Sequence, residues 1–295
     1  MRPLETKSIG FIGVGRMGWP IASHLVAKGF RLTVCDTNQV VAAQFAEQFG
    51  ARCAKDISTL AADTQVLISS VPADVDLLNI ARGLSPTLTA VHLWIDHSTT
   101  SARIAREVAS QVHAQGASFL DAPVSGGVDG AKAASLTVMV GGEPNAFDRA
   151  QPIMQAYSAR QVHMGSAGAG QVTKMTNQIC VAGLCQALAE GLDFAETAGL
   201  DVRKVIHVML QGSSASWQMA NRAHKMLEGE YEWGFATALM RKDLALILEE
   251  ARHLDVPLPA TSMVDQFLAE VSAMGGKRWD WCSLMERQRR RKLKP

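Results

Sequence analysis

The stretch Ser8-Ile-Gly-Phe-Ile-Gly13-Val-Gly15-Arg-Met-Gly18 decides the fold of this 295-residue chain. Its first residues are mostly apolar and predict a buried strand. The glycines then follow at the spacing G-x-G-x-x-G, and Ile21, Leu25 and Val26 recur at helical spacing up to Gly29. A strand, this glycine pattern and a helix, in that order, form the context of a dinucleotide-binding site.

Each glycine of the pattern has a separate physical task. Gly13 permits a tight turn, Gly15 lets the backbone approach a pyrophosphate, and Gly18 lets the helix pack on the strand. The phosphates would lie against the amides of the helix N-terminus. We therefore predict cofactor contacts from six consecutive residues, which are Gly13, Val14, Gly15, Arg16, Met17 and Gly18.

A second strand is predicted at residues 31–35, and it is followed directly by Asp36. A carboxylate at this place accepts hydrogen bonds from the ribose hydroxyls and repels a 2′-phosphate. We therefore predict NAD rather than NADP as the cofactor. Asn38 and the more distant Arg52 keep NADP open as the alternative.

Short apolar runs continue to alternate with helical patterns up to about residue 163. Strands separated by helices predict parallel pairing with right-handed crossovers. The predicted strands are 66–70, 91–96, 119–121, 136–141 and 161–163, with helices at 104–112 and 144–157. Because ligands bind at the carboxyl ends of such strands, we expect Val71, Pro72, Ser98 and Thr99 to border the cofactor.

The loop Asp121-Ala-Pro-Val-Ser125-Gly126-Gly127 also follows a predicted strand. Ser125 offers a hydroxyl, and the two glycines expose backbone amides that can form an anion nest. An ordinary glycine-rich turn is the alternative. The position at a strand end in a nucleotide fold favours a site for a substrate carboxylate, formed by Ser125, Gly126 and Gly127.

The second half of the chain shows helical patterns only. From about Ala169 we predict helices at 172–198, 201–210, 217–227, 237–254 and 259–274. This change predicts an NAD-binding domain at 1–165 and a helical domain for substrate binding and oligomerisation at 166–295. The first of these helices is apolar almost all round, which predicts burial on several sides and a homodimer or homotetramer.

Lys174 lies near the start of that helix, and Asn177 and Gln178 share its face at i+3 and i+4. A lysine in a dry pocket has a lowered pKa and can exchange a proton with a carbonyl or an alcohol. The alternative is a lysine that extends to solvent beside an inert amide face, and the helix pattern alone favours it. The glycine pattern and the loop at Ser125 reverse this preference, so Lys174, Asn177 and Gln178 are the predicted catalytic residues.

Composition limits the classes of partner. The net charge of +1 and the 47% of hydrophobic residues argue for a packed protein without nucleic acid or an anionic membrane as its main partner. The five cysteines show no metal-ligand spacing, which predicts reduced thiols in a cytoplasmic protein and no metal. We see no signal peptide and no membrane span. Cys180 and Cys185 are predicted to be packing residues, and the basic run 287–294 a solvated tail.

Together the motifs resemble the β-hydroxyacid dehydrogenase family. Four blocks in order carry this resemblance over nearly the whole chain, namely 10–20, 121–127, 165–174 and 235–244. It implies a Rossmann-type, doubly wound, mostly parallel sheet followed by an all-α C-terminal domain, with the substrate between them. It also implies that Lys174 is catalytic, that residues 125–127 bind carboxylate, that Thr99 and Lys242 contact the cofactor, and that Trp217 and Phe235 line the substrate pocket.

The resemblance implies hydride transfer, without a metal, between NAD and a small β-hydroxyacid such as 3-hydroxyisobutyrate or glycerate. Many family members carry two asparagines where this chain has Asn177 and Gln178, which weakens an assignment to 3-hydroxyisobutyrate. Two alternatives remain open. One is an imine reductase, whose relatives usually lack the lysine at position 174, and the other is a non-catalytic NAD-binding module on the same fold.

Overall fold

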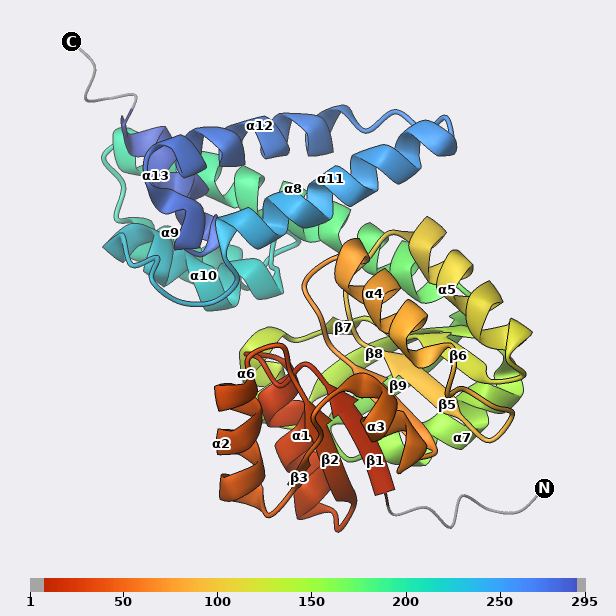
Figure 1. Cartoon of the computed structure of the whole chain (residues 1–295). Helices are drawn as coiled ribbons and strands as arrows, with labels where there is room; N and C mark the ends of the chain where they lie inside the picture. The colour runs from red at the N-terminus through yellow and green to blue at the C-terminus, as the bar shows by residue number, and fades with distance from the viewer. Residues whose placement is uncertain (1–7, 291–295) are drawn as a thin grey trace. The chain divides into compact units, whose positions relative to one another are not determined.

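The computed structural model of the protein describes residues 8–290. The chain divides into two compact units, residues 1–174 and residues 175–295 (Figure 1). Of the helices in the described part, none is both long and apolar enough to cross a membrane. The boundary predicted after residue 165 stays a prediction.

Strands and helices alternate through the first unit, as the sequence predicts. The elements are β1 (Ser8–Ile12), α1 (Gly18–Ala27), β2 (Arg31–Cys35), α2 (Gln39–Phe49), β3 (Arg52–Cys53), α3 (Ile57–Ala62), β4 (Val66–Ser69), α4 (Asp74–Leu84), β5 (Leu93–Asp96), α5 (Ala102–Ala114), β6 (Ser118–Asp121), β7 (Val124–Ser125), α6 (Gly127–Lys132), β8 (Leu136–Gly142), α7 (Pro144–Met154) and β9 (Ser158–Gly165).

The strands form one mixed sheet in the order β3-β2-β1-β4-β5-β6-β8-β7, and β9 also pairs with β8. Pairing is parallel from β3 to β6 and between β8 and β9. The pairs β6–β8 and β7–β8 are antiparallel, so the sheet is mostly parallel, as predicted. The strand order reverses between β1 and β4, and this switch point is where such sheets bind ligands.

Both faces of the sheet are buried, because alternate residues of each strand enter different cores. On β4, Val66 and Ile68 join a core with residues of α1, α2 and α7. Leu67 of the same strand joins a second core with residues of α3, α4 and α5. This alternation follows from the period of two of a strand, and it produces the doubly wound layers around the sheet (Figure 1).

The second unit is helical. Helix α8 (Ala169–Thr197) begins in the first unit and continues into the second, followed by α9 (Val202–Met209), α10 (Trp217–Glu228), α11 (Thr237–His253), α12 (Pro259–Ala273), the short 3₁₀ helices η1 (Gly276–Arg278) and η2 (Trp281–Ser283), and α13 (Leu284–Arg290). One apolar core holds them together and includes Leu192, Leu244, Leu268 and Leu284. The predicted fold class is confirmed in both parts.

Two sequence predictions about the second half are wrong. The basic run does not form a solvated tail from its start, because Arg287 pairs with Glu270 and Arg289 donates to the carbonyl oxygens of Met226 and Leu227. These contacts with α12 and α10 hold the chain in place up to Arg290; residues 291–295 lie outside the described part. Cys180, predicted to pack, is exposed, whereas Cys185 is buried as predicted.

Candidate active site

A row of residues in register crosses the carboxyl ends of four neighbouring strands. Ile12 of β1 pairs with Ser69 of β4, Ser69 with Asp96 of β5, and Asp96 with Asp121 of β6. Ser69, Asp96 and Asp121 are fully buried. Burial of a polar group costs free energy unless the group is hydrogen-bonded. The hydrogen bonds of these three side chains therefore show which segments they hold in place.

Asp96 fixes the two loops that the sequence places beside the cofactor. Its Oδ1 accepts hydrogen bonds from the hydroxyls of Ser69 and Ser98, both at 2.6 Å. The Ser98 oxygen in turn accepts the amide of Val71 at 2.9 Å, and the Ser69 oxygen accepts the indole N–H of Trp94 at 2.8 Å. The loops after β4 and β5 are therefore joined through one carboxyl group.

Burial changes the acidity of the groups at this edge. It raises the pKa of Asp96 to about 6, although the hydroxyls of Ser69 and Ser98 oppose the change. It also raises the pKa of Asp121 to about 6. The neighbouring His97 is fully buried between the carbonyl oxygen of Ala122 and the hydroxyl of Tyr157, and burial lowers its pKa to about 4.

Asp96→Asn is expected to reduce the pH dependence of stability. A carboxyl whose pKa rises on folding stabilises the native state below the unfolded pKa, and this contribution is lost as the pH rises through about 6. A rise of this size in the pKa corresponds to ~3 kcal/mol in total. Urea unfolding at a series of pH values measures this contribution. Between about pH 5 and pH 7.5, the free energy of unfolding should fall by about 1 kcal/mol less in the variant than in the wild type.

His97 acts with the opposite sign below its unfolded pKa, and it is present in both proteins. The charge of Asp96 is a minor cause of the raised pKa of Asp121, so the difference between the two proteins arises mainly from Asp96. An unchanged pH dependence in the variant would show that the Asp96 carboxyl has its ordinary acidity.

The glycine turn after β1 has the geometry that the sequence predicts. Gly13 has a φ of +88°, and a Cβ on Gly18 would collide with the carbonyl oxygen of Gly13. A Cβ on Gly15 would meet nothing within 4 Å, so the space beside this exposed residue is open. These properties fit the close approach of a pyrophosphate to the backbone.

Asp36 stands directly beside this turn. Its Oδ2 accepts the amide of Val14 at 2.9 Å, and its Oδ1 accepts the amide of Asn38 at 2.8 Å. Asn38 itself caps α2 by accepting the amides of Val40 and Val41. The carboxylate is therefore fixed between the glycine turn and the start of α2, where the sequence places the ribose.

The loop that carries Ser125 is held from two sides. Ser125 belongs to β7 and pairs with Thr137 of β8. Gly126 and Gly127 follow with φ of +126° and +63°, and both are exposed. The short helix α6 ends against α1, because the imidazole Nε2 of His24 lies 3.0 Å from the carbonyl oxygen of Ala131. The two glycines supply backbone conformations that other residues rarely adopt.

Lys174 is half-buried on α8 and is the last residue of the first unit. Asn177 and Gln178 follow on the same helix in the second unit. Gln178 is buried, and its amide nitrogen donates to Oδ2 of Asp243 at 2.7 Å. The oxygen of Gln178 accepts the amide of Asn177 at 2.9 Å. Both ends of the Gln178 side chain are therefore used by protein groups.

The carboxylate of Asp243 also contacts Lys242, which the resemblance places at the cofactor. Lys242 is adjacent to Asp243 on α11, and its ammonium nitrogen lies 3.0 Å from Oδ1 of Asp243. The second unit thus contains one connected group of polar side chains, namely Asn177, Gln178, Lys242 and Asp243. The sequence identifies Lys242 but not its neighbour Asp243, whose carboxylate connects the two segments.

Trp217 and Phe235 lie near a buried ion pair of the second unit. The guanidinium group of Arg222 is bonded to both carboxylate oxygens of Asp280 and lies 5.2 Å from the ring centre of Trp217. Asp280 also accepts the amide of Phe235 at 2.8 Å. Trp217 is 61% exposed, so its side chain is not part of the apolar core of the second unit. Its role as a pocket wall stays a prediction.

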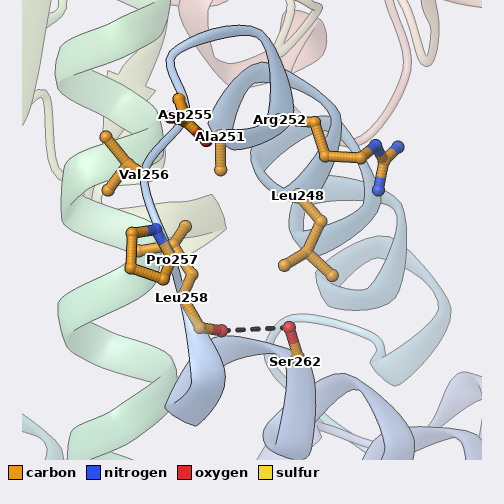
Figure 2. A pocket seen from close by; sticks show the side chains of 8 residues that line it. All are labelled: Leu248, Ala251, Arg252, Asp255, Val256, Pro257, Leu258 and Ser262. Carbon is orange, nitrogen blue, oxygen red and sulfur yellow. Dashed lines mark hydrogen bonds between the residues drawn. The ribbon is translucent and has the colours of Figure 1, made fainter.

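One open pocket of about 490 Å³ lies at the turn between α11 and α12 (Figure 2). It is lined by Leu248, Ala251, Arg252, Asp255, Val256, Pro257, Leu258 and Ser262. Figure 2 shows the hydroxyl of Ser262 donating to the carbonyl oxygen of Leu258, at 3.0 Å. None of the residues predicted to bind cofactor or substrate lines this pocket, so it does not enter the candidate site. Within residues 8–290 there is no group of three or more His, Cys, Asp or Glu side chains that could hold a metal ion.

Two family models match the chain, one in the first half and one in the second. Residues 8–165 match the family model of the NAD-binding domain of 6-phosphogluconate dehydrogenase. Residues 168–287 match the family model of the NAD-binding domain of NADP-dependent 3-hydroxyisobutyrate dehydrogenase. The two descriptions name different forms of the cofactor, so they support NAD(P) binding without selecting one form.

Individual relatives cover nearly the entire chain. An uncharacterized oxidoreductase of Shewanella frigidimarina is 45% identical, with 95% of this chain and 97% of the relative covered. The mitochondrial 3-hydroxyisobutyrate dehydrogenase of Rattus norvegicus is 30% identical, with 97% and 88% covered. The solved structure of 3-hydroxyisobutyrate dehydrogenase from Mycobacterium tuberculosis with L-serine has a TM-score of 0.88 at 30% identity and covers 95% of this chain and 98% of that chain. The glycine turn, the doubly wound sheet and the helical second unit are thus those of an NAD(P)-dependent oxidoreductase, and the chain belongs to the β-hydroxyacid dehydrogenase family.

Proposed function

We propose that the protein is an NAD-dependent dehydrogenase or reductase of a small β-hydroxyacid, with Lys174 as the general acid and base. The observation that carries the proposal is the position of Asp121. This residue ends β6, the strand that leads into the loop of Ser125, and its carboxylate binds the start of the helix that carries Lys174. The candidate carboxylate loop and the candidate proton donor are therefore connected through one residue.

The residues of the first unit suit the reaction. Ser125, Gly126 and Gly127 would hold the substrate carboxylate and set the position of the carbinol carbon, and such orientation accounts for much of the rate of an enzyme. The amine of Lys174 would take the proton of the substrate hydroxyl during oxidation and return it to the carbonyl oxygen during reduction. A nicotinamide cofactor, held at the glycine turn by its pyrophosphate, would supply the hydride acceptor or donor.

Asn177 and Gln178 have different parts in this proposal. Both amide ends of Gln178 are occupied, by Asp243 and by Asn177, so we assign Gln178 to orienting its neighbour. Asn177 donates to Gln178 with its amide nitrogen and would use its carbonyl oxygen toward the substrate. The sequence leaves open which of the two amides contacts the substrate, and this assignment selects Asn177.

The proposal for the cofactor is NAD, and it is supported by Asp36. A carboxylate fixed by the amides of Val14 and Asn38 cannot turn away easily from a 2′-phosphate. The interactions of Lys242, Trp217 and Phe235 with cofactor or substrate stay predictions. We also propose a homo-oligomer formed through the second unit, where Phe194 of α8 is 76% exposed.

Asp36→Ala is expected to shift the cofactor preference. Removing the negative charge should raise the ratio of kcat/KM for NADPH to that for NADH by about tenfold, which corresponds to ~1.4 kcal/mol. Steady-state kinetics with both cofactors measure this ratio. Asp148→Asn removes an exposed carboxylate from α7 and should leave the ratio unchanged. A wild-type protein that uses NADPH as efficiently as NADH would contradict the assignment.

The function itself is tested with a panel of substrates at fixed NAD, comprising 3-hydroxyisobutyrate, serine, glycerate, threonate and 4-hydroxybutyrate. We expect NADH formation with at least one of them. If none is turned over, the result favours an imine reductase or a non-catalytic NAD-binding module, which reduction of a cyclic imine would then separate.

A further inference from the structure

Asp121 connects the loop of Ser125 to the start of α8, but it takes no part in the proposed chemical steps. Its carboxylate is fully buried and points at the first turn of α8. Oδ1 accepts the amide of Gly168 at 2.7 Å, and Oδ2 accepts the amide of Gln171 at 2.9 Å. These amides belong to the helix N-terminus, where backbone N–H groups have no partner within the helix and a negative charge is favourable.

Gln171 ties the same turn to a second strand end. Its amide nitrogen donates to the carbonyl oxygen of Ser98 at 2.8 Å, and its amide oxygen accepts the N–H of Thr100 at 3.1 Å. Gln171 is fully buried. The start of α8 is therefore bound both to the end of β6, through Asp121, and to the loop after β5, where Thr99 is the predicted cofactor contact.

The start of α8 lies so close to the sheet that a side chain would not fit between them. A Cβ on Gly170 would lie 2.8 Å from the carboxylate of Asp121 and would also collide with the carbonyl oxygens of Asp121 and Met139. A Cβ on Gly141 of β8 would lie 2.8 Å from both the amide of Gly170 and the carbonyl oxygen of Ser166. Backbone thus packs on backbone at this point, so the helix start has one position.

Lys174 follows Gln171 by three residues, which is just under one helical turn. Side chains of a helix are inclined toward its N-terminus, so the stem of Lys174 extends back over the turn that Asp121 and Gln171 hold. A shift of that turn displaces the amine by a similar amount, and a displacement of about 1 Å at a catalytic group can reduce the rate by about a hundredfold.

We propose that Asp121, together with Gln171, is a positioning residue that sets the location of Lys174 relative to the loops after β5 and β6. The inference rests on the proposed function, because it gives Asp121 a task only if Lys174 transfers the proton. Burial raises the pKa of Asp121 to about 6. Because this value still lies below 7, the carboxyl group that binds the two amides is mostly ionised at neutral pH.

The test is Asp121→Asn, which keeps the size of the side chain but replaces one acceptor oxygen by a donor that faces an amide. We expect kcat to fall by about tenfold or more, with KM for substrate and Kd for NADH within about threefold of the wild type. Hydrogen exchange of the amides at 168–174 should become faster. Asp201→Asn is the matched control, because Asp201 accepts two amides at the start of α9, and it should change neither kcat nor exchange in α8.

A double-mutant cycle separates positioning from a general loss of structure. In the Lys174→Ala background, Asp121→Asn should change the residual kcat by less than about twofold, because the group that it positions is absent. A loss as large as in the wild type would overturn the inference, and so would an unchanged kcat in the single variant. Should Asp121→Asn fail to fold, Gln171→Met removes the contacts to Ser98 and Thr100 and is held to the same criteria.

The two levels of proposal fail in different ways. If Lys174→Ala keeps most of its activity, the proposed function is wrong about the proton donor and the positioning role falls with it. If activity depends on Lys174 but the losses from Asp121→Asn and Lys174→Ala are additive, only the positioning role is wrong.

Discussion

Lys174→Ala is expected to lower kcat by about a hundredfold or more, because general acid–base catalysis commonly contributes a factor of this size. The binding of NADH should change little, since the glycine turn and Asp36 lie elsewhere in the first unit. Turnover of the active substrate and fluorescence titration of NADH measure the two quantities. Lys174→Arg should be almost as inactive, because the guanidinium group keeps the charge but does not release its proton.

Lys204→Ala is the control for this experiment. Lys204 is an exposed residue of α9 whose ammonium group lies 3.6 Å from the carboxylate of Asp201, so its loss should leave kcat unchanged. A Lys174→Ala protein with most of the wild-type activity would remove Lys174 from the mechanism.

The second large effect is expected at Gly126. Its φ of +126° lies outside the conformations that L-residues with a side chain adopt readily, and a Cβ would lie 3.2 Å from Leu136. Gly126→Ala should therefore rearrange the loop that is proposed to hold the substrate carboxylate. We expect KM for the substrate to rise by about tenfold or more, as if ~1.4 kcal/mol of binding were lost, with the Kd of NADH unchanged.

Gly116→Ala separates this effect from backbone strain alone. Gly116 also has a positive φ, of +77°, but it lies in the turn between α5 and β6, at the opposite end of that strand from Asp121. We expect a modest loss of stability and an unchanged KM. A Gly126→Ala enzyme with the wild-type KM would exclude the loop as the carboxylate site.

Local patterns are sufficient to predict the fold. The strand, turn and helix at residues 8–29 depend on contacts between neighbours in the sequence. The spacing of the glycines is therefore sufficient to predict this unit. The antiparallel strand β7 escapes prediction because it contains only Val124 and Ser125, which is too short for a periodicity of two to be visible. The role of Arg289 escapes prediction because its acceptors are carbonyl oxygens 62 and 63 residues away.

In the candidate site, too, local features can be predicted from the sequence and contacts between distant residues cannot. Asp36 is identifiable from the sequence because it directly follows a strand, and the structure places it beside the glycine turn. The task of Gln178 is not visible there, because its partner Asp243 is 65 residues distant and nothing in the local pattern connects them. Asp96 and Asp121 look like ordinary ends of strands. Only the register of neighbouring strands shows that they stand side by side under the loops.

The row of buried carboxyls also bears on how the protein tolerates change. Asp96 accepts hydrogen bonds from the hydroxyls of Ser69 and Ser98, and Asp121 accepts the amides of Gly168 and Gln171. An apolar residue in the place of either carboxyl would leave these buried donors without a partner, at a cost of about 1–3 kcal/mol each. The same two residues fix the cofactor loops and the start of α8. Selection for heat resistance and selection for turnover therefore act in the same direction at these two residues, and laboratory evolution under heat alone should retain both carboxyls.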